Sequence, residues 1–302
     1  MKHTSSPSSF LKKTLLMLTL MGSAAFAQTY PDKNIKILQG FAPGGNADAI
    51  ARAVGTEISK SLGQAVVVEA QAGAGGTIAA TTVAKAKPDG YTLLLATGGH
   101  AVAGAIYNNL NYKTVQDFEM ISTITYFPFL VVVSADNKIA NFPALIAQAK
   151  ANPGKIAYGT AGIGSTHHLA GELLASMAKV DLLHVPYRGD AGSITALLSG
   201  DVPFIIAPPT AVLSNIKAGK LKALAITARK RWSELPEVPT IDESAVKGFV
   251  YTPWYGFWFP AGVAPDTVAR MRNEVAKVLE EPDIKRAFAE QGFAVVGSSS
   301  AE

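Results

Sequence analysis

Four glycine-rich segments are the places in this sequence where backbone atoms could bind a ligand. Each joins an expected strand to an expected helix: residues 41–48 (Phe-Ala-Pro-Gly-Gly-Asn-Ala-Asp), 72–77, 159–168 and 185–190. Glycine permits positive φ and a close approach of a ligand to the chain. The free amides at the start of a helix attract an anion. Any one of these segments could be a simple tight turn, but the four together favour a small anion gripped by backbone amides.

The residues that could catalyse a reaction form no recognisable enzyme motif. The chain has no cysteine, which excludes disulfides, thiolate catalysis and Cys-ligated metals. It contains neither a Gly-x-Ser-x-Gly nor a Gly-Lys-Ser/Thr motif. His167 and His168 are adjacent and would diverge by about 100° on a helix, so they do not form a metal pair. A triad of Ser165, His168 and Asp190 is not favoured, because the spacing implies no contact between nucleophile and base. We therefore predict no catalytic residue, no metal and no cofactor.

Strands and helices alternate along the chain, which predicts an α/β fold. The clearest helix covers 46–62, where apolar residues recur at helical spacing. The clearest strand covers 91–96, with Leu93-Leu94-Leu95 apolar throughout. The other expected strands are 35–41, 66–68, 121–133, 156–159, 182–185, 202–207, 221–227 and 251–259. The other expected helices are 76–86, 142–151, 166–177, 193–198, 211–218 and 266–279. Two successive α/β units predict two lobes, each with a parallel sheet.

Two of these strands are expected to connect the lobes. The run 121–133 is long enough to leave one lobe and enter the other, and 221–227 would return. Lobe 1 would then comprise 28–123 and 227–302, with lobe 2 inserted as 124–226. Two crossing strands would act as the hinge of a closing binding protein. Two sequential domains are the alternative, but the middle of the chain has no flexible linker rich in Gly, Ser or Pro.

The first 27 residues are typical of a secretion signal. Three lysines precede a short apolar core, and Ala25-Phe26-Ala27 has the small-x-small form that signal peptidase recognises. A membrane anchor is the alternative, but the apolar part is shorter than the roughly 20 residues that span a bilayer. We predict cleavage after Ala27 and a location in the periplasm.

Composition excludes several classes of protein. Of the 302 residues, 48% are apolar and only 17% are charged, which excludes a disordered chain. Lys and Arg exceed Asp and Glu by four, and three of these lysines lie in the expected signal, so the mature chain is nearly neutral. It has no basic stripe, and we expect no nucleic-acid partner.

Several strings, in the same order as in the family, resemble the Bug proteins, the periplasmic solute-binding subunits of tripartite tricarboxylate transporters. They are residues 41–48, 88–93 (Pro-Asp-Gly-Tyr-Thr-Leu), 184–189 (His-Val-Pro-Tyr-Arg-Gly), 224–227 (Leu-Ala-Ile-Thr) and 231–240 (Arg-Trp-Ser-Glu-Leu-Pro-Glu-Val-Pro-Thr). The likeness covers nearly the whole mature chain. It implies a two-lobed type II periplasmic-binding fold, with two crossing hinge strands and one organic acid between the lobes.

The resemblance also implies the residues of the site and the partners. A carboxylate would be held by the first-lobe Pro-Gly-Gly loop, the second-lobe Gly-Ser-Thr helix start and bridging waters, with Phe41 as an apolar wall. The implied ligand-binding residues are Phe41, Gly44, Gly45, Asn46, Ala47, Asp48, Gly164, Ser165, Thr166, His168, Tyr187 and Asp190. The ligand would be a mono- or dicarboxylate, including an aromatic one. The protein partners would be integral-membrane permease subunits, and we expect a monomer.

The sequence departs from the family pattern at two places. Asp190 stands where relatives often carry a small residue; it could meet a ligand amine or cation or cap the next helix, and we favour the cap. Residues 298–302 look like the start of a helix with no helix after it, which suggests a truncated chain.

Two classes of function remain open. The first is a receptor that hands a carboxylate to a permease, and the second is an exported hydrolytic enzyme on a similar scaffold. The missing nucleophile and metal motifs favour the receptor. A ligand sensor for a signalling partner would use the same site, and the sequence does not separate it from the receptor.

Overall fold

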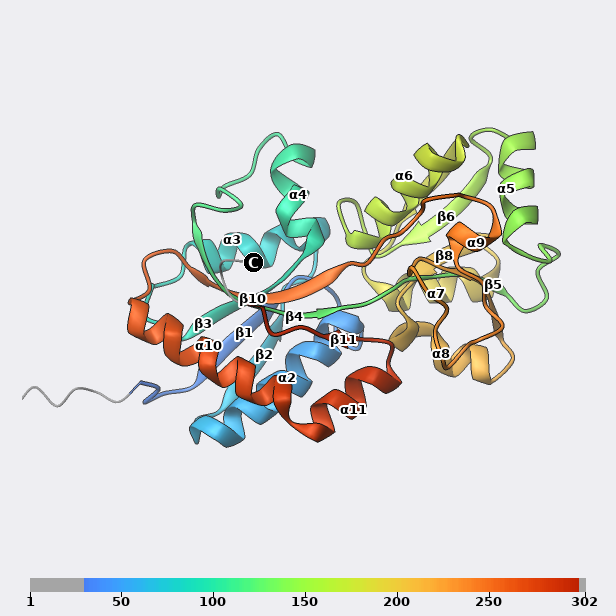
Figure 1. Cartoon of the computed structure of the whole chain (residues 1–302). Coiled ribbons are helices and arrows are strands. Elements are labelled where there is room, and N and C mark those ends of the chain that lie inside the picture. The colour runs from blue at the N-terminus through green and yellow to red at the C-terminus, as the bar shows by residue number, and fades with distance from the viewer. Residues whose placement is uncertain (1–29, 299–302) are drawn as a thin grey trace, which may run out of the picture. The chain divides into compact units, whose positions relative to one another are not determined.

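Two β-sheets, each covered by helices, position the glycine-rich segments (Figure 1). The structure is a computed structural model that describes residues 30–298. The expected signal, residues 1–27, therefore lies outside the described residues. Both sheets belong to the compact unit that begins at Lys33. The predicted α/β class with two lobes is confirmed, whereas the expectation of parallel sheets is wrong, because both sheets also contain antiparallel pairs.

The first sheet has six strands in the order β11-β4-β10-β3-β1-β2. Strands β1, β2 and β3 are parallel, whereas β10 runs antiparallel to β3 and β4, and β11 antiparallel to β4. The strands are β1 (Ile35–Gln39), β2 (Val66–Ala70), β3 (Thr92–Thr97), β4 (Phe118–Tyr126), β10 (Trp254–Pro260) and β11 (Ala294–Val295). Its helices are α2 (Asn46–Leu62), α3 (Thr77–Ala84), α4 (Gly98–Ile106), α10 (Pro265–Glu280) and α11 (Pro282–Glu290), with the short turn η1 (Ala74–Gly76) before α3.

The second sheet has five strands in the order β7-β6-β8-β5-β9. Strand β6 is parallel to β7 and β8, whereas β5 is antiparallel to β8 and β9. The strands are β5 (Leu130–Ser134), β6 (Ile156–Thr160), β7 (Leu182–Pro186), β8 (Phe204–Ala207) and β9 (Leu221–Ile226). Its helices are α5 (Phe142–Ala151), α6 (Thr166–Ala178), α7 (Asp190–Ser199), α8 (Pro209–Lys217) and α9 (Ile241–Ser244).

Helix α2 shows how apolar spacing anchors the first glycine-rich loop. Ile50, Val54 and Ile58 recur at helical spacing and are all buried. The helix ends at Gly63, whose φ of 66° lies in the left-handed region and whose amide donates to the carbonyl of Ser59. The predicted limits 46–62 are confirmed, so the free amides at the start of α2 are fixed just beyond the end of β1.

The first connection between the sheets differs from the single strand expected over 121–133. It consists of β4 in the first sheet and β5 in the second, separated by residues 127–129. Pro128 has no amide hydrogen to donate and restricts the residue before it, so a continuous ladder is interrupted there. The amide of Phe127 instead donates to the carbonyl of Pro253 at 3.0 Å.

The return to the first sheet lies later than expected. Strand β9 does not cross; it pairs with β5 inside the second sheet, which corrects the return expected at 221–227. The crossing segment is 251–253, where the amide of Tyr251 donates to the carbonyl of Thr227, and β10 follows in the first sheet. Leu235 and Val238 pack in the core of the second sheet. The predicted lobe limits, 28–123, 124–226 and 227–302, remain a prediction, and this packing favours a second lobe that extends past 226.

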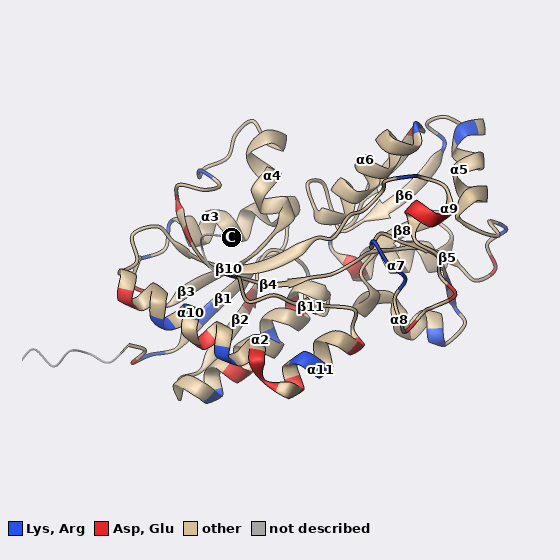
Figure 2. Cartoon of the chain, viewed as in Figure 1, with Lys and Arg blue, Asp and Glu red and all other residues tan. Residues whose placement is uncertain are grey.

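The chain end and the charged residues complete the fold. Residues 294–298 lie along β4, where Val296 and Gly297 donate to backbone carbonyls. Lys and Arg are interspersed with Asp and Glu over the helices and loops of the described part of the chain (Figure 2). Within residues 30–298, no helix combines the length and the apolar character needed to cross a membrane.

Candidate ligand-binding site

Three helix starts meet at the side chain of Asp190. Asp190 is the first residue of α7, and its Oδ2 accepts a hydrogen bond of 3.2 Å from the backbone amide of Asn46, the first residue of α2. Its Oδ1 lies 2.8 Å from Nε2 of His167 in α6. A Cβ added to Gly45 would lie 3.0 Å from Asp190 Oδ2, so the carboxylate packs closely on the start of α2. The anion site at that helix start therefore holds a carboxylate of the protein itself.

The pair formed by Asp190 and His167 is buried, with 7% and 4% of each residue exposed. Burial acts to raise the pKa of Asp190, but His167 and the Asn46 amide lower that pKa by more, so it lies below its usual range. The carboxylate is therefore ionised at neutral pH. The favoured expectation that Asp190 caps its own helix is wrong, because α7 has no side-chain cap. The side chain instead caps α2, 144 residues earlier in the chain.

The side chain of Asn46 connects elements of both sheets. Its Nδ2 donates to the hydroxyl of Tyr255 in β10 at 3.4 Å, and its Oδ1 accepts from the hydroxyl of Thr210 in α8 at 2.8 Å. Asn46 is 2% exposed. Its backbone and side chain therefore both hold the two lobes together in this structure.

The start of α6 uses its polar groups within its own loop. The hydroxyl of Ser165 donates to the carbonyl of Gly162 at 2.7 Å and accepts the amide of His168 at 3.3 Å, so Ser165 is the cap of α6. Nδ1 of His168 accepts the amide of Gly164, and the imidazole stacks on His184 at 4.1 Å. Burial lowers the pKa of His168 in spite of Glu172. These groups shape the loop that faces the first lobe.

The first-lobe loop is organised by Asp48. Its Oδ2 accepts the amide of Gly44 at 3.1 Å and lies 2.9 Å from Nε of Arg52. Gly44 has φ of +80°, which favours glycine at this turn. Burial acts to raise the pKa of Asp48, but Arg52 and the Gly44 amide lower it by more. Ala47 is buried in the helix behind the loop.

Glycines let the loops of the two lobes touch. A Cβ on Gly75 would lie 2.5 Å from the carbonyl oxygen of Ile163, and one on Gly99 would lie 2.5 Å from that of Gly164. The hydroxyl of Tyr107 also donates to the carbonyl of Ile163, at 2.9 Å. The described arrangement is therefore one in which the loops of both lobes are in contact.

A cavity of about 430 Å³ lies between these loops; we call it the loop cavity. Its walls come from β1–α2 and β2–α3 on one side and from β6–α6 and β7–α7 on the other. The lining residues are Gly40, Phe41, Ala42, Ala72, Gly73, Ala74, Gly75, Ile78, Ala161, Gly162, Ile163, Tyr187, Arg188 and Gly189. Among them only Arg188 carries a formal charge. The loop cavity thus offers many backbone groups, several apolar side chains and one cation.

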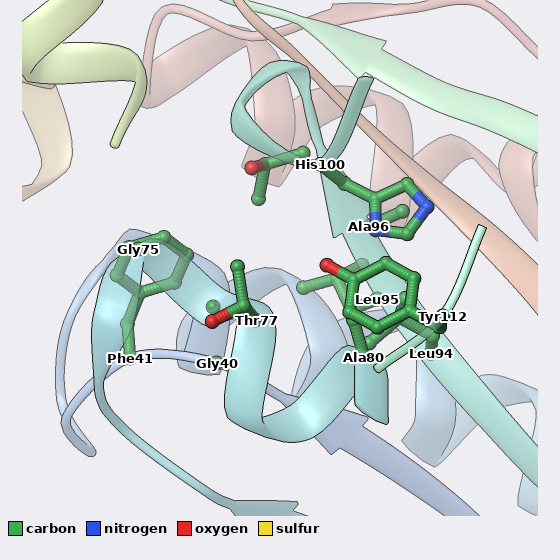
Figure 3. Close-up of a pocket in the computed structure, with 12 residues that line it drawn as sticks. Gly40, Phe41, Gly75, Thr77, Ala80, Leu94, Leu95, Ala96, His100 and Tyr112 are labelled. Carbon is green, nitrogen blue, oxygen red and sulfur yellow. The ribbon is translucent and has the colours of Figure 1, made fainter. Parts of the chain in front are cut away.

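A second, small cavity of about 10 Å³ lies behind Phe41 in the first lobe. Figure 3 shows Phe41 and Tyr112 on opposite sides of Thr77, with His100 above Tyr112. Nε2 of His100 lies 2.8 Å from the carbonyl of Thr114, and its ring packs against Tyr112 and neighbouring aromatic rings. This space holds at most about one water, so it is not a ligand site.

The structure separates the residues predicted for ligand binding into groups. Phe41 and Tyr187 line the loop cavity. Gly45, Asn46 and Asp190 meet one another, whereas the other predicted residues lie in the helix starts and loops behind: Gly44, Ala47, Asp48, Gly164, Ser165, Thr166 and His168. Whether the residues outside the loop cavity touch a ligand remains a prediction.

Sequence reasoning missed four side chains at this site. Ile78, Ile163 and Arg188 line the loop cavity, and His167 pairs with Asp190. The glycine content identified their segments, so the signal for the loops was present. Tertiary structure decides which side chains of a loop face the cavity. Because His167 and His168 are adjacent in the sequence, nothing local indicated that only His167 would contact Asp190.

Comparison with known proteins gives one consistent family. Residues 50–302 match the family described as "Tripartite tricarboxylate transporter family receptor". Protein BugT of Bordetella pertussis is 36% identical over 268 residues, which cover 88% of this chain and 82% of BugT. Among solved structures, R. palustris Rpa4515 with adipate has a TM-score of 0.85 at 32% identity, covering 89% of this chain and 91% of that one. MatC (Rpa3494) of Rhodopseudomonas palustris with bound malate has a TM-score of 0.83 at 31% identity, covering 88% and 91%.

These relatives are solute-binding proteins and not enzymes, which excludes the exported hydrolase considered from the sequence. Four of the five family strings, from 88–93 to 231–240, lie within the matched residues 50–302, and the first, 41–48, lies just before them. The chain belongs to the tripartite tricarboxylate transporter receptor family as a Bug-type periplasmic solute-binding protein.

Proposed function

We propose that this receptor binds a small organic carboxylate in the loop cavity and delivers it to a membrane permease. The observation that carries the proposal is the cavity itself: glycine-rich loops of both lobes enclose about 430 Å³, and Arg188 is the one charged residue that lines it. Arginine and free backbone amides are the usual partners of a carboxylate in proteins. The relatives with adipate and malate support the same class of ligand.

Within this proposal, the predicted residues have different tasks. Phe41 and Tyr187 contact the ligand from opposite lobes. Asp48 and Ser165 hold the two loops in shape through hydrogen bonds to Gly44 and Gly162. The carboxylate of the ligand meets Arg188 and the nearby loop amides.

A thermal-shift screen of mono-, di- and tricarboxylates tests the proposal, followed by calorimetric titration of the best ligand. A ligand at 100 times its Kd should stabilise the folded protein by about 2.7 kcal/mol. Arg188→Gln should weaken binding at least tenfold, since hydrogen bonds to charged groups are worth about 1.5–3 kcal/mol. Arg229→Gln, at an exposed arginine that does not line the cavity, is the matched control and should bind normally. The ligand should be recovered unchanged; absence of binding by every carboxylate would refute the proposal.

Export and delivery need separate tests. Mass measurement of periplasmic extract should give a mature chain that begins at Gln28, and a chain that keeps residues 1–27 would contradict the predicted cleavage. Cells that lack this protein should lose high-affinity uptake of the identified carboxylate. Wild-type protein should restore that uptake and Arg188→Gln should not, whereas normal uptake without the protein would contradict delivery to a permease.

A further inference from the structure

The amide end of α2 is already occupied by a carboxylate. Asp190 Oδ2 accepts the Asn46 amide at 3.2 Å, and the side chain is buried against Gly45. A ligand carboxylate at the same place would bring two negative charges together in a site with little water, which is strongly unfavourable. This helix start is therefore closed to the acid groups of a ligand.

The imidazole of His167 beside this helix start is also engaged. Nε2 of His167 lies 2.8 Å from Asp190 Oδ1, and its ring stacks with Phe129 at a centroid distance of 4.5 Å. Its Nε2 is therefore taken by Asp190 and is not available to a second acid group of a ligand.

The open part of the site has one cation and apolar walls. Arg188 is the charged lining residue, and it is exposed. Ile78 from the first lobe and Ile163 from the second are about half exposed, at 48% and 50%, although both are large apolar side chains. Phe41 and Tyr187 add aromatic surface from the two sides. Covering these side chains with an apolar ligand body would be favourable, whereas placing a second carboxylate among them would desolvate a charge without a partner.

We infer that this receptor selects a monocarboxylate with an apolar body over a dicarboxylate of equal length, and that Asp190 is the residue that sets this preference. The inference rests on the proposed function. It assigns the ligand carboxylate to Arg188 and the apolar body to Phe41, Ile78, Ile163 and Tyr187. Asp190 occupies the amide end of α2, which the second carboxylate of a diacid could otherwise bind.

Calorimetric titration with two pairs of acids tests the inference: hexanoate against adipate, and benzoate against terephthalate. In each pair the carbon skeleton is similar and the second carboxylate is the difference. We expect the monoacid to bind at least tenfold more tightly in one pair or both. Tighter binding of the diacid in either pair, or a preference for the monoacid below tenfold in both pairs, would overturn the inference and leave the proposed function standing. Absence of binding by all four acids and by the wider carboxylate screen would overturn both.

Asp190→Ser tests the assigned residue directly. The substitution removes the carboxylate from the start of α2 beside His167. Gly189, the neighbour of Asp190, lines the loop cavity, so the freed position is close to that cavity. We expect adipate to gain at least tenfold in affinity relative to hexanoate. Asp190→Asn, which keeps the shape of the side chain and removes the charge, should shift the ratio in the same direction if Asp190→Ser folds poorly. Asp266→Ser, at an exposed acid in the first turn of α10, is the control and should leave the ratio unchanged. An unchanged ratio in both Asp190 variants would refute the role of Asp190.

Discussion

Asp190 stabilises a helix that begins 144 residues earlier in the chain, through one carboxylate that is buried against His167 and the Asn46 amide. The pKa of Asp190 is lower in the folded state than in the unfolded chain, where it is about 3.9. The pair therefore stabilises the folded protein at pH values above about 3.9. This contribution is lost as the pH falls through the folded pKa. Asp190→Asn should cost about 3 kcal/mol of stability at pH 5, since it leaves one partner of a buried pair. The gap in melting temperature between wild type and variant should narrow between pH 4 and pH 2.5.

The exposed acid Asp266 provides the control for this pH dependence. Asp266→Asn should follow the wild-type melting profile at each pH. A gap for Asp190→Asn that stays constant down to pH 2.5 would show that the carboxylate of Asp190 does not have a lowered pKa in the folded state.

Ser165 is predicted from the sequence to bind the ligand, and its hydroxyl also has two partners within its own loop. The sequence suggests a hydroxyl that binds the ligand, whereas in the structure this hydroxyl donates to Gly162 and caps α6. Ser165→Ala should therefore lower stability by about 1 kcal/mol. Ser165→Asn, which can still cap the helix, should recover part of it, and chemical denaturation of the three proteins measures the differences. A Ser165→Ala protein with wild-type stability but much weaker ligand binding would instead support a direct contact with the ligand.

At the scale of elements, the contact between the β2–α3 and β6–α6 loops depends on the absence of a side chain at Gly75. Its φ is +63°, and a Cβ would come within 2.5 Å of the Ile163 carbonyl. Gly63 has a similar φ of +66° and nothing within 4 Å of the added Cβ. Gly63→Ala therefore serves as the control that has the backbone strain without the steric clash. Gly75→Ala should weaken ligand binding severalfold or more, while Gly63→Ala lowers stability by about 1 kcal/mol and leaves affinity unchanged. Equal ligand affinities of Gly75→Ala and wild type would show that binding does not need this contact.

Local sequence signals predicted the elements well where they were strong and failed where tertiary structure decides. Helices α2 and α5 begin and end as predicted, since their apolar spacing and terminal residues agree. Helix α4 was missed because it begins Gly-Gly-His and contains another glycine, which hides its periodicity. The run 121–133 contains no charged residue, and such a run does not reveal that its two halves pair in different sheets. The partner of Asp190 could not be predicted either, because pairing across 144 residues leaves no local pattern.

At the scale of the whole molecule, the chain passes between the sheets twice, at 127–129 and at 251–253. These two connecting segments lie side by side. The amide of Phe127 donates to Pro253, and that of Tyr251 donates to Thr227, whose own amide donates to Phe129. Two short connections bonded to the same neighbours can bend together while each sheet stays rigid, which is how hinge closure works in binding proteins. The loop contacts at Ile163 and the Asn46–Asp190 bond are then the contacts that closure makes.

Ligand binding should therefore make the protein more compact in solution. The closed arrangement is held by a few hydrogen bonds between the lobes, each worth only about 1 kcal/mol net, so without ligand the open form should be well populated. A ligand in the loop cavity contacts both sets of loops and adds its binding free energy to the closed form alone. Small-angle scattering at saturating hexanoate, or at saturating concentrations of whichever carboxylate binds best, should show a smaller radius of gyration than the free protein, and the liganded profile should match the described structure of residues 30–298. Gly75→Ala should show less compaction at saturation. Identical profiles for free and saturated wild-type protein would mean that the loop cavity is preformed and that the segments 127–129 and 251–253 do not act as a hinge during binding.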